Sequence, residues 1–204
     1  MLRSFLSLAL CAGAACAQVQ MLEPKEAFAG FRDVNDKREL FGPVFKNMIE
    51  RYNALAEENC SGLRLGDGNR VLLESRGEGY GVRLSLKDKD GQGLSGAPLV
   101  GFLLLDKPAS LGPAALKQGV HLLLVTSGKL YLSQGYDEAA LELAKPLDPE
   151  TEKDNGPRPK LSLALEARQA FLLIGENRFA FRSPAPPPKG VGAKPAAAGA
   201  AGKK

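Results

Sequence analysis

The sequence predicts a mainly β fold: an antiparallel β-sandwich-like domain with one N-terminal amphipathic α-helix. From Gly62 to Arg182 the chain consists of short apolar or alternating runs that turn residues separate at a spacing of roughly 8–12 residues, as in sandwiches and barrels. Before this region, residues 43–59 carry a stripe of apolar side chains at helical spacing. If this helix lies at the centre of the domain, the fold class becomes α+β.

The chain is organised around residues 80–105, which predict a strand, a turn and a second strand. In residues 82–87 apolar side chains alternate with polar ones, the period of a strand with one face on a core and one in water. Residues 88–93 (DKDGQG) end this strand, because Asp and Gly satisfy the backbone locally and tolerate positive φ. Residues 99–105 are nearly all apolar, broken only by Gly101, which indicates a strand covered on both faces.

Within this stretch, residues at six positions match a strand-turn-strand sequence motif: Leu86, Asp88, Asp90-Gly91, Leu94, Gly96-Ala97 and Leu99. With them, residues 82–100 resemble the strand-turn-strand of bacterial immunoglobulin-like and transthyretin-like modules, V-x-V-x-D-x-x-G-x-P-L-x-G-A-x-V. Gly93 stands in place of the usual proline, and Pro98 follows the alanine. The resemblance implies a sandwich used for adhesion, spacing or ligand display, and it carries over no catalytic residue.

Residues 1–17 (MLRSFLSLALCAGAACA) predict a signal peptide. Arg3 supplies the positive n-region, residues 5–15 the short apolar h-region, and Ala15-Cys16-Ala17 an A-x-A cleavage site. The apolar run is too short for a spanning helix, so the mature chain is expected to have no transmembrane span. In the alternative, Cys16 becomes the lipidated N-terminus of a lipoprotein, although the Leu usual three residues before a lipobox cysteine is missing. We expect a periplasmic or secreted protein, with a lipid anchor through Cys16 as the alternative.

Residues 18–42 form a mixed, polar N-terminal extension, in which residues 35–41 fit a short helix. A single β-rich domain then covers residues 43–182. It starts with a leading helix over residues 43–59, where Pro43 suits the first helical position. The apolar stripe of this helix comprises Val44, Phe45, Met48, Ile49, Tyr52, Leu55 and Ala56. We expect the stripe to pack on the sheet, with a partner-binding face as the alternative.

Beyond residue 62, pairs of apolar runs that enclose turn residues predict hairpins. The enclosed turns are GDGN at 66–69, TSGK at 126–129 and GENR at 175–178. Residues 136–147 fit either a strand or a short helix, whereas residues 148–160 are expected to form a solvated loop. Residues 161–167 alternate as a strand does, which brings the expected total to about nine or ten short strands.

Residues 183–204 (SPAPPPKGVGAKPAAAGAAGKK) cannot bury a core and predict a disordered tail. Four lysines in it offer contacts to an envelope protein or to an anionic polymer of the cell envelope, namely Lys189, Lys194, Lys203 and Lys204. The simpler interpretation is a spacer that only aids solubility. The four lysines and Arg3 together carry more positive charge than the net charge of +4 of the whole chain. Residues 18–182 are therefore close to neutral, which argues against nucleic-acid binding.

No catalytic residue is assigned. His121 is the only histidine, and it lies in an apolar strand pattern. A triad would have to combine it with Ser95, Ser127 or Ser133. None of these serines lies in a G-x-S-x-G elbow, so a structural or surface histidine is the favoured interpretation. Cys60 is the only cysteine left after signal cleavage, so no intrachain disulfide is expected, and burial as a small apolar residue is favoured over a nucleophilic role.

No metal or cofactor site is assigned, because one Cys and one His make no zinc or haem signature. The weak candidates for calcium are Asp88 and Asp90 beside Gly91, since hard cations take clustered oxygens on a turn that glycine permits. The EF-hand spacing is absent: Leu86 stands at the first-ligand position and Ala97 at that of the bidentate Glu. An acidic β-turn is therefore the favoured interpretation.

The leading hypothesis is a non-catalytic cell-envelope protein that serves as a binding or scaffold module. An export signal, a sandwich pattern and the lack of an assembled catalytic motif motivate it. The first alternative is a secreted hydrolase whose catalytic residues converge only in space. The second is a carrier of a small apolar ligand held between the Leu-rich strands.

Overall fold

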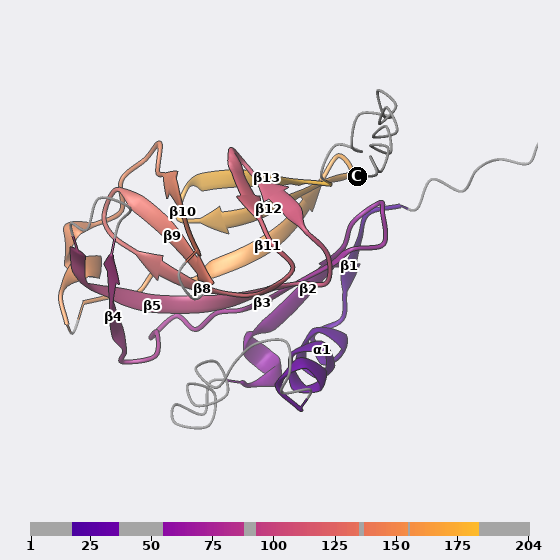
Figure 1. The fold of residues 1–204 in the computed structure, drawn as a ribbon, viewed down its shortest axis with the longest axis horizontal. Coiled ribbons are helices and arrows are strands. Elements are labelled where there is room, and N and C mark those ends of the chain that lie inside the picture. Colours follow the sequence, from indigo (N-terminus) through magenta and orange to yellow (C-terminus); the bar gives the residue numbers. More distant parts are fainter. Residues whose placement is uncertain (1–17, 37–54, 88–92, 135–136, 155, 184–204) are drawn as a thin grey trace, which may run out of the picture.

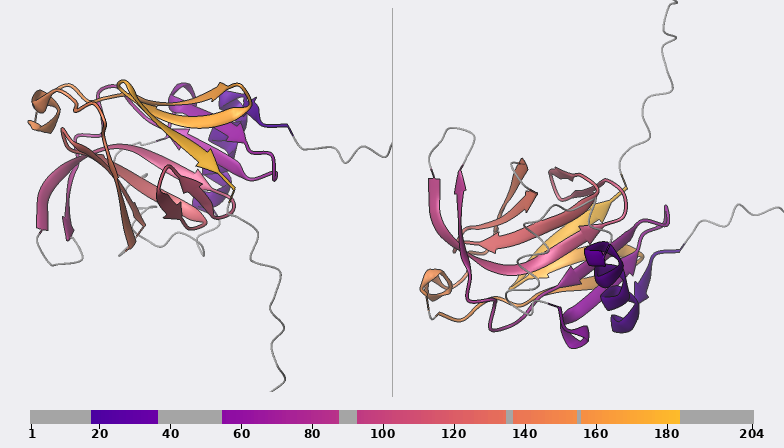
Figure 2. Two further views of the ribbon diagram at one scale, coloured as in Figure 1. Left: turned by 90° about the horizontal axis from the view of Figure 1, so that it is seen from above. Right: turned by 60° about the horizontal axis from the view of Figure 1, so that its bottom comes forward.

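The computed structural model describes residues 18–36, 55–87, 93–134, 137–154 and 156–183. In these ranges two antiparallel sheets pack face to face, and helix α1 (Pro24–Asp36) lies beside one of them (Figures 1 and 2). The fold class predicted from the sequence, a mainly β sandwich-like domain with one N-terminal α-helix, is confirmed.

The larger sheet has eight strands in the order β1-β2-β3-β5-β8-β9-β10, with β4 paired to β5. Their bounds are β1 Gln20–Leu22, β2 Cys60–Arg64, β3 Arg70–Glu74, β4 Arg83–Lys87, β5 Gly93–Leu105, β8 Gly119–Val125, β9 Lys129–Gln134 and β10 Asp137–Glu142. The long strand β5 pairs with β4 through its first half and with β3 through its second half, while β8 pairs with the second half from the other side. The register of the β5–β8 pair shifts between Leu99 and Gly101, which places a bulge at Val100.

The smaller sheet has five strands in the order β11-β12-β13-β6-β7. Their bounds are β6 Ala109–Leu111, β7 Ala114–Leu116, β11 Leu161–Glu166, β12 Gln169–Ile174 and β13 Asn177–Arg182. At its two edges this sheet approaches the larger one, because β7 lies near β10 and β11 lies near β1 and β2. The hairpins predicted around 66–69, 126–129 and 175–178 are confirmed as β2–β3, β8–β9 and β12–β13.

The principal core lies between the sheets, and its residues follow the alternation of the strands. Inward-facing leucines of the larger sheet include Leu73, Leu103 and Leu123, all at most 1% exposed. The smaller sheet contributes Leu172 and Phe181 from β12 and β13. Burial of this many aliphatic side chains, each worth about 1.5–3 kcal/mol, is the main force that holds the two layers together.

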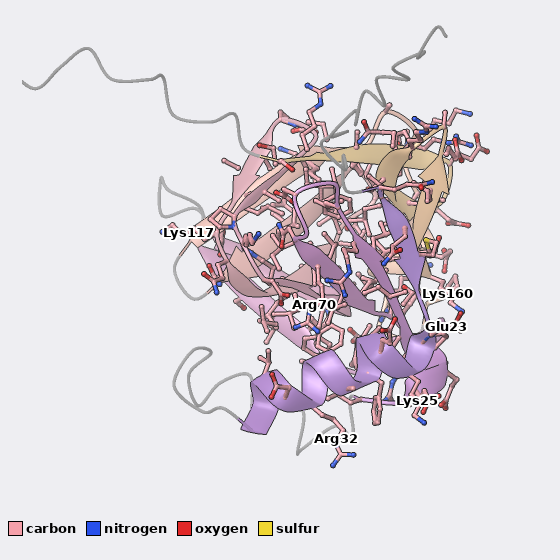
Figure 3. All side chains as sticks on the ribbon, turned by 90° about the vertical axis from the view of Figure 1, so that its right-hand side faces the viewer. Glu23, Lys25, Arg32, Arg70, Lys117 and Lys160 are labelled. Carbon is pink, nitrogen blue, oxygen red and sulfur yellow. The ribbon has the colours of Figure 1, made fainter. Side chains whose placement is uncertain are left out.

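A second core lies on the outer face of the larger sheet, under α1. Pro24 opens the helix, and Ala27 and Phe31, one turn apart, are both fully buried against the sheet. The helix backbone approaches the strands closely at Gly30, where an added Cβ atom would clash with Leu72 Cδ1. Lys25 and Arg32 extend from the opposite side of the helix, away from the sheet (Figure 3).

The position of the N-terminal helix differs from the sequence-based expectation. Helix α1 occupies residues 24–36, inside the segment that was expected to be a polar extension with at most a short helix at its end. Of the leading helix expected over residues 43–59, residues 43–54 lie outside the described ranges. Leu55 and Ala56 are not helical, and Glu57–Asn59 form a single 3₁₀ turn (η1) that runs directly into β2.

The ambiguous residues 136–147 contain a strand, β10, and not a helix. The loop expected over 148–160 is largely exposed but not irregular throughout. It contains a 3₁₀ turn, η2 (Pro149–Glu152), which the side chain of Asp148 caps through Glu150 N at 2.9 Å and in which Thr151 is buried.

Among the helices in the described ranges, none combines the length and the hydropathy that a membrane span requires. The signal peptide at 1–17 with Cys16, the calcium candidates Asp88 and Asp90, and the four lysines of the C-terminal tail all lie outside these ranges.

Candidate functional site

The structure places the residues of the conceivable Ser-His triad apart. His121 pairs with Leu103 across β8 and β5 and faces the inter-sheet core, where its Nε2 lies 2.9 Å from Lys117 O. Ser133 pairs with Leu122 and therefore faces the opposite side of the same sheet. Ser127 lies six residues from His121 along the chain, about 20 Å away for an extended strand, and Ser95 is about 26 Å from the register position of His121. No candidate serine is therefore positioned for proton transfer to His121.

Cys60 lies in a different environment from His121, beside an acid that the sequence reasoning did not single out. It pairs directly with Glu74 across β2 and β3. Glu74 pairs in turn with Phe102 of β5, so the three side chains form a row on the outer face of the larger sheet, at strand spacings of about 4.8 Å. Cys60 is 4% exposed and Glu74 is fully buried.

The turn that follows β3 supplies the polar partners of Glu74. Tyr80 donates its hydroxyl hydrogen to Glu74 Oε2, and Arg76 Nε lies 3.4 Å from Glu74 Oε1. The guanidinium of Arg76 lies 5.3 Å from the centroid of the Tyr80 ring, and that ring packs edge-on against Phe102 at 5.1 Å between centroids. Glu74 thus anchors residues 75–80 to the second core.

The electrostatics of this cluster favour neutral side chains. Burial raises the pKa of the Glu74 carboxyl from 4.5 to about 8, although the charge of Arg76 and its hydrogen bond act to lower it. Burial, and after it the nearby Glu74 carboxylate, raises the pKa of the Cys60 thiol from 9.0 to about 12. Because the thiolate is the reactive form, Cys60 stays an unreactive thiol at neutral pH. Cys60 and Glu74 therefore form part of a structural polar cluster and do not act as a nucleophile and its base.

A neighbouring residue joins the two sheets through a buried hydrogen-bond bridge. Ser75, 1% exposed, donates its hydroxyl hydrogen to Val100 O at 2.9 Å and accepts from Leu161 N at 3.1 Å. Val100 is the bulged residue of β5, and Leu161 opens β11 of the smaller sheet. One hydroxyl therefore hydrogen-bonds a backbone group of each sheet.

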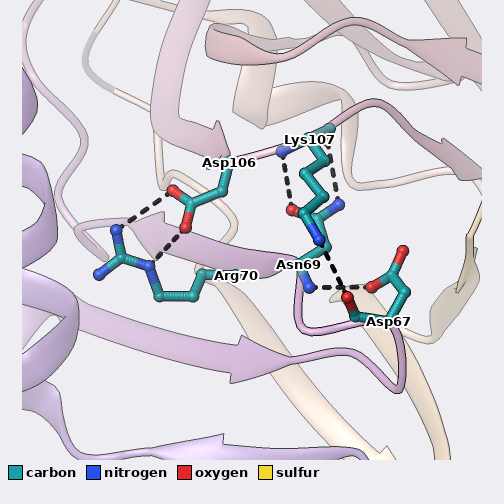
Figure 4. A network of polar contacts seen from close by, with 5 residues as sticks. All are labelled: Asp67, Asn69, Arg70, Asp106 and Lys107. Atoms are coloured by element: carbon teal, nitrogen blue, oxygen red, sulfur yellow. Dashed lines mark hydrogen bonds and ion pairs between the residues drawn. The ribbon is translucent and has the colours of Figure 1, made fainter. Parts of the chain in front are cut away.

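A second polar network closes the end of the sandwich near the β2–β3 turn (Figure 4). The amide of Asn69, fully buried, pairs with the backbone of Lys107: Nδ2 donates to its carbonyl at 3.0 Å, and Oδ1 accepts from its N–H at 2.9 Å. Arg70 and Asp106 form an adjacent ion pair at 2.5 Å. These contacts fasten the β2–β3 turn to the end of β5.

The outer face of the smaller sheet has a different character. Phe171 and Leu173 of β12 point outward, are half-buried, and belong to neither core cluster. On either side of Phe171 lie small residues, Ala164 of β11 and Ala180 of β13. Helix α1 lies on the other side of the molecule, against the larger sheet (Figure 1). We call the outward-facing residues Ala164, Phe171, Leu173 and Ala180 the β12 strip.

Arginines surround the β12 strip. Arg178 and Arg182 of β13 are exposed and alternate with Ala180 on its outward side, and Arg168 is exposed at the tip of the β11–β12 hairpin. Glu166 of β11 is the acid that faces the strip from the same side, and Arg178 Nη1 lies 2.6 Å from its Oε2. Ala167 and Arg168 both have positive φ, 46° and 68°, in a tight turn where neither residue is a glycine.

The described ranges contain no group of three or more His, Cys, Asp or Glu side chains that would hold a metal ion. No protein-family model, no curated protein and no solved structure matches this chain.

Proposed function

We propose that the protein is a non-catalytic binding module of the cell envelope and that it binds its partner through the β12 strip. The observation that carries this proposal is the outward position of Phe171 and Leu173, outside both cores and among arginines. Aromatic and arginine side chains are the ones most enriched where proteins contact one another. The predicted signal peptide supports the envelope as the place of action.

The arrangement of potential catalytic groups supports a binding role over a hydrolase. His121 and the candidate serines lie apart, and the thiol of Cys60 is held protonated. A binding surface on a rigid sheet needs no such convergence, because contact area and a few anchoring side chains supply the affinity.

Site-specific photocrosslinking in cells tests the proposal. A photoreactive amino acid at Ala164, beside Phe171, is expected to give one reproducible covalent adduct from native envelopes. The same residue at Ala29, exposed on α1 on the other side of the molecule, is the matched control and is expected to give no such adduct. The Phe171→Ser change in the Ala164 reporter should abolish the adduct while thermal unfolding shows that the variant stays folded.

Two results would overturn the proposal. One is an adduct pattern that is the same from Ala164 and Ala29. The other is an Ala164 adduct that persists in a folded Phe171→Ser variant, since the contact would then not depend on the strip.

A further inference from the structure

The charge pattern around the β12 strip points to the chemistry of the partner, an inference that rests on the proposed function. Arg178 and Arg182 flank the strip on β13, exposed Arg168 stands at the β11–β12 turn, and Glu166 is the acid on the outward side of β11. Glu176, exposed at the β12–β13 turn, is ion-paired with Lys145. The outer face of the smaller sheet is therefore positively charged although residues 18–182 as a whole are close to neutral. A partner with acidic residues would gain from this local field, and a basic one would be repelled.

The Arg178–Glu166 ion pair spans the strip. β12 lies between β11 and β13, so an ion pair from β11 to β13 on the outer face must pass over the outward side chains of β12. Phe171 is the middle one of these. The pair therefore covers part of the apolar surface that a partner would need, which agrees with the half-buried state of Phe171.

This ion pair is weak enough to be exchanged. The side chains of Arg178 and Glu166 are 58% and 47% exposed, and exposed pairs contribute about 0–1 kcal/mol, much of it lost at high salt. A carboxylate from outside could replace Glu166 on Arg178 at little net cost. Moving the pair aside would also bare the ring of Phe171, whose alanine neighbours leave room beside it.

The same charges argue against two other occupants of the strip. A second copy of this chain packed face to face would bring three arginines against three arginines. The chain's own residues after Ser183 carry four lysines and no acid, so they would be repelled as well. Like charges opposed across an interface cost affinity.

We infer that the β12 strip binds an acidic polypeptide segment with interspersed apolar side chains, whose carboxylate displaces Glu166 from Arg178. An apolar side chain of the partner packs on Phe171 and Leu173, and its carboxylates take the arginines. Glu166 acts as an internal competitor that occupies Arg178 in the free protein.

Fluorescence anisotropy with labelled peptides tests this exchange on the full mature chain. The probes are the acidic apolar peptide EEFEELEE, the acidic peptide without apolar residues EESEESEE, and the basic apolar peptide KKFKKLKK. Binding is expected for the first only, with affinity that falls as salt is raised. Equal binding of EESEESEE would overturn the apolar part of the inference and favour an anionic polymer. Equal binding of KKFKKLKK would overturn the electrostatic part.

Variants distinguish the exchange from simple charge attraction. Glu166→Gln should tighten the binding of EEFEELEE by about 2–5-fold, the equivalent of one exposed ion pair. Arg178→Gln should weaken it by about 5–10-fold, and Arg32→Gln on α1 should leave it unchanged. Circular dichroism would confirm that each variant is folded. Unchanged or weaker binding by a folded Glu166→Gln variant would refute the exchange.

The two experiments separate the inference from the proposed function. A strip-dependent crosslink in cells without EEFEELEE binding would leave the binding surface standing and refute the acidic partner. EEFEELEE binding that follows the predicted variant pattern, without a strip-dependent crosslink, would support the chemistry of the strip and refute its use in the envelope.

Discussion

Replacing Glu74 by glutamine is expected to abolish a large pH dependence of stability. Glu74 is fully buried, and its pKa is raised from 4.5 to about 8, first by burial and against the influence of Arg76. The unfolded chain therefore releases this proton near pH 4.5 and the folded chain only near pH 8. Between these values the folded state binds more protons than the unfolded state, so ionisation favours unfolding as the pH rises.

The sign and size follow from this linkage. For a carboxyl whose folded pKa is raised, the full stability is present below the unfolded pKa and is lost as the pH rises towards the folded one. The slope is about 1.4 kcal/mol per pH unit, so about 3–4 kcal/mol of unfolding free energy is lost between about pH 5 and about pH 8. That is a large part of the roughly 5–15 kcal/mol of a typical domain.

Urea unfolding of the wild type and of Glu74→Gln at several pH values measures the effect. Glutamine keeps a carbonyl oxygen for the Tyr80 hydroxyl but cannot ionise. The difference in unfolding free energy between the two proteins should therefore change by about 1.4 kcal/mol per pH unit in favour of the variant as the pH rises. The control is Glu142→Gln, since the Glu142 side chain is 75% exposed and should show no such trend. A difference for Glu74→Gln that does not vary with pH would refute the reasoning.

Two further changes probe the backbone geometry of the sandwich. Ser75→Ala should lower the unfolding free energy by about 1–3 kcal/mol in urea unfolding, because it leaves Val100 O and Leu161 N buried without their partner. The control is Ser162→Ala, which changes an exposed serine. A loss for Ser75→Ala no larger than that of the control would contradict the hydrogen-bond bridge. Combining Ala167→Asn with Arg168→Gly should raise the melting temperature and increase the unfolding free energy by about 1–2 kcal/mol, because asparagine and glycine adopt the positive φ of this turn with less strain. An unchanged or lower melting temperature would show that the turn is not strained.

Alternation and turn residues were sufficient to predict the mainly β fold class and three hairpins, but not the order of the strands or the short strands β6 and β7. The predicted hairpins formed around GDGN, TSGK and GENR because each turn joins two runs long enough to pair and apolar enough to be buried. Helix α1 escaped prediction because its buried stripe is short: over residues 24–34, where the structure describes the side chains, Ala27 and Phe31 are the fully buried ones among several charged residues. Pro24, a start signal of the same kind as Pro43, was the available clue.

The Glu74 cluster could not be found from local pattern, because its burial depends on contacts between distant segments. At the end of the run Val71–Leu73, a glutamate suggests the point where a strand leaves the core. In the structure, however, Glu74 points to the same face of β3 as Leu72, and the second core covers that face. Strand alternation implies the burial of Glu74 only when this second core is known. The partner hydroxyl of Tyr80 and the neighbouring thiol of Cys60 are brought to it only by the folded chain.

The strand β12 shows how a continuous apolar run can indicate a surface. A run such as AFLLI is usually interpreted as a strand covered on both faces. The inward side chains Ala170, Leu172 and Ile174 already complete the inter-sheet core, so Phe171 and Leu173 are not needed for the packing of the two sheets. Large apolar side chains outside a core lower solubility unless something covers them. Small flanking alanines and nearby arginines suit a contact surface for an acidic partner, and this is the physical basis of our proposal that the protein binds its partner through this face.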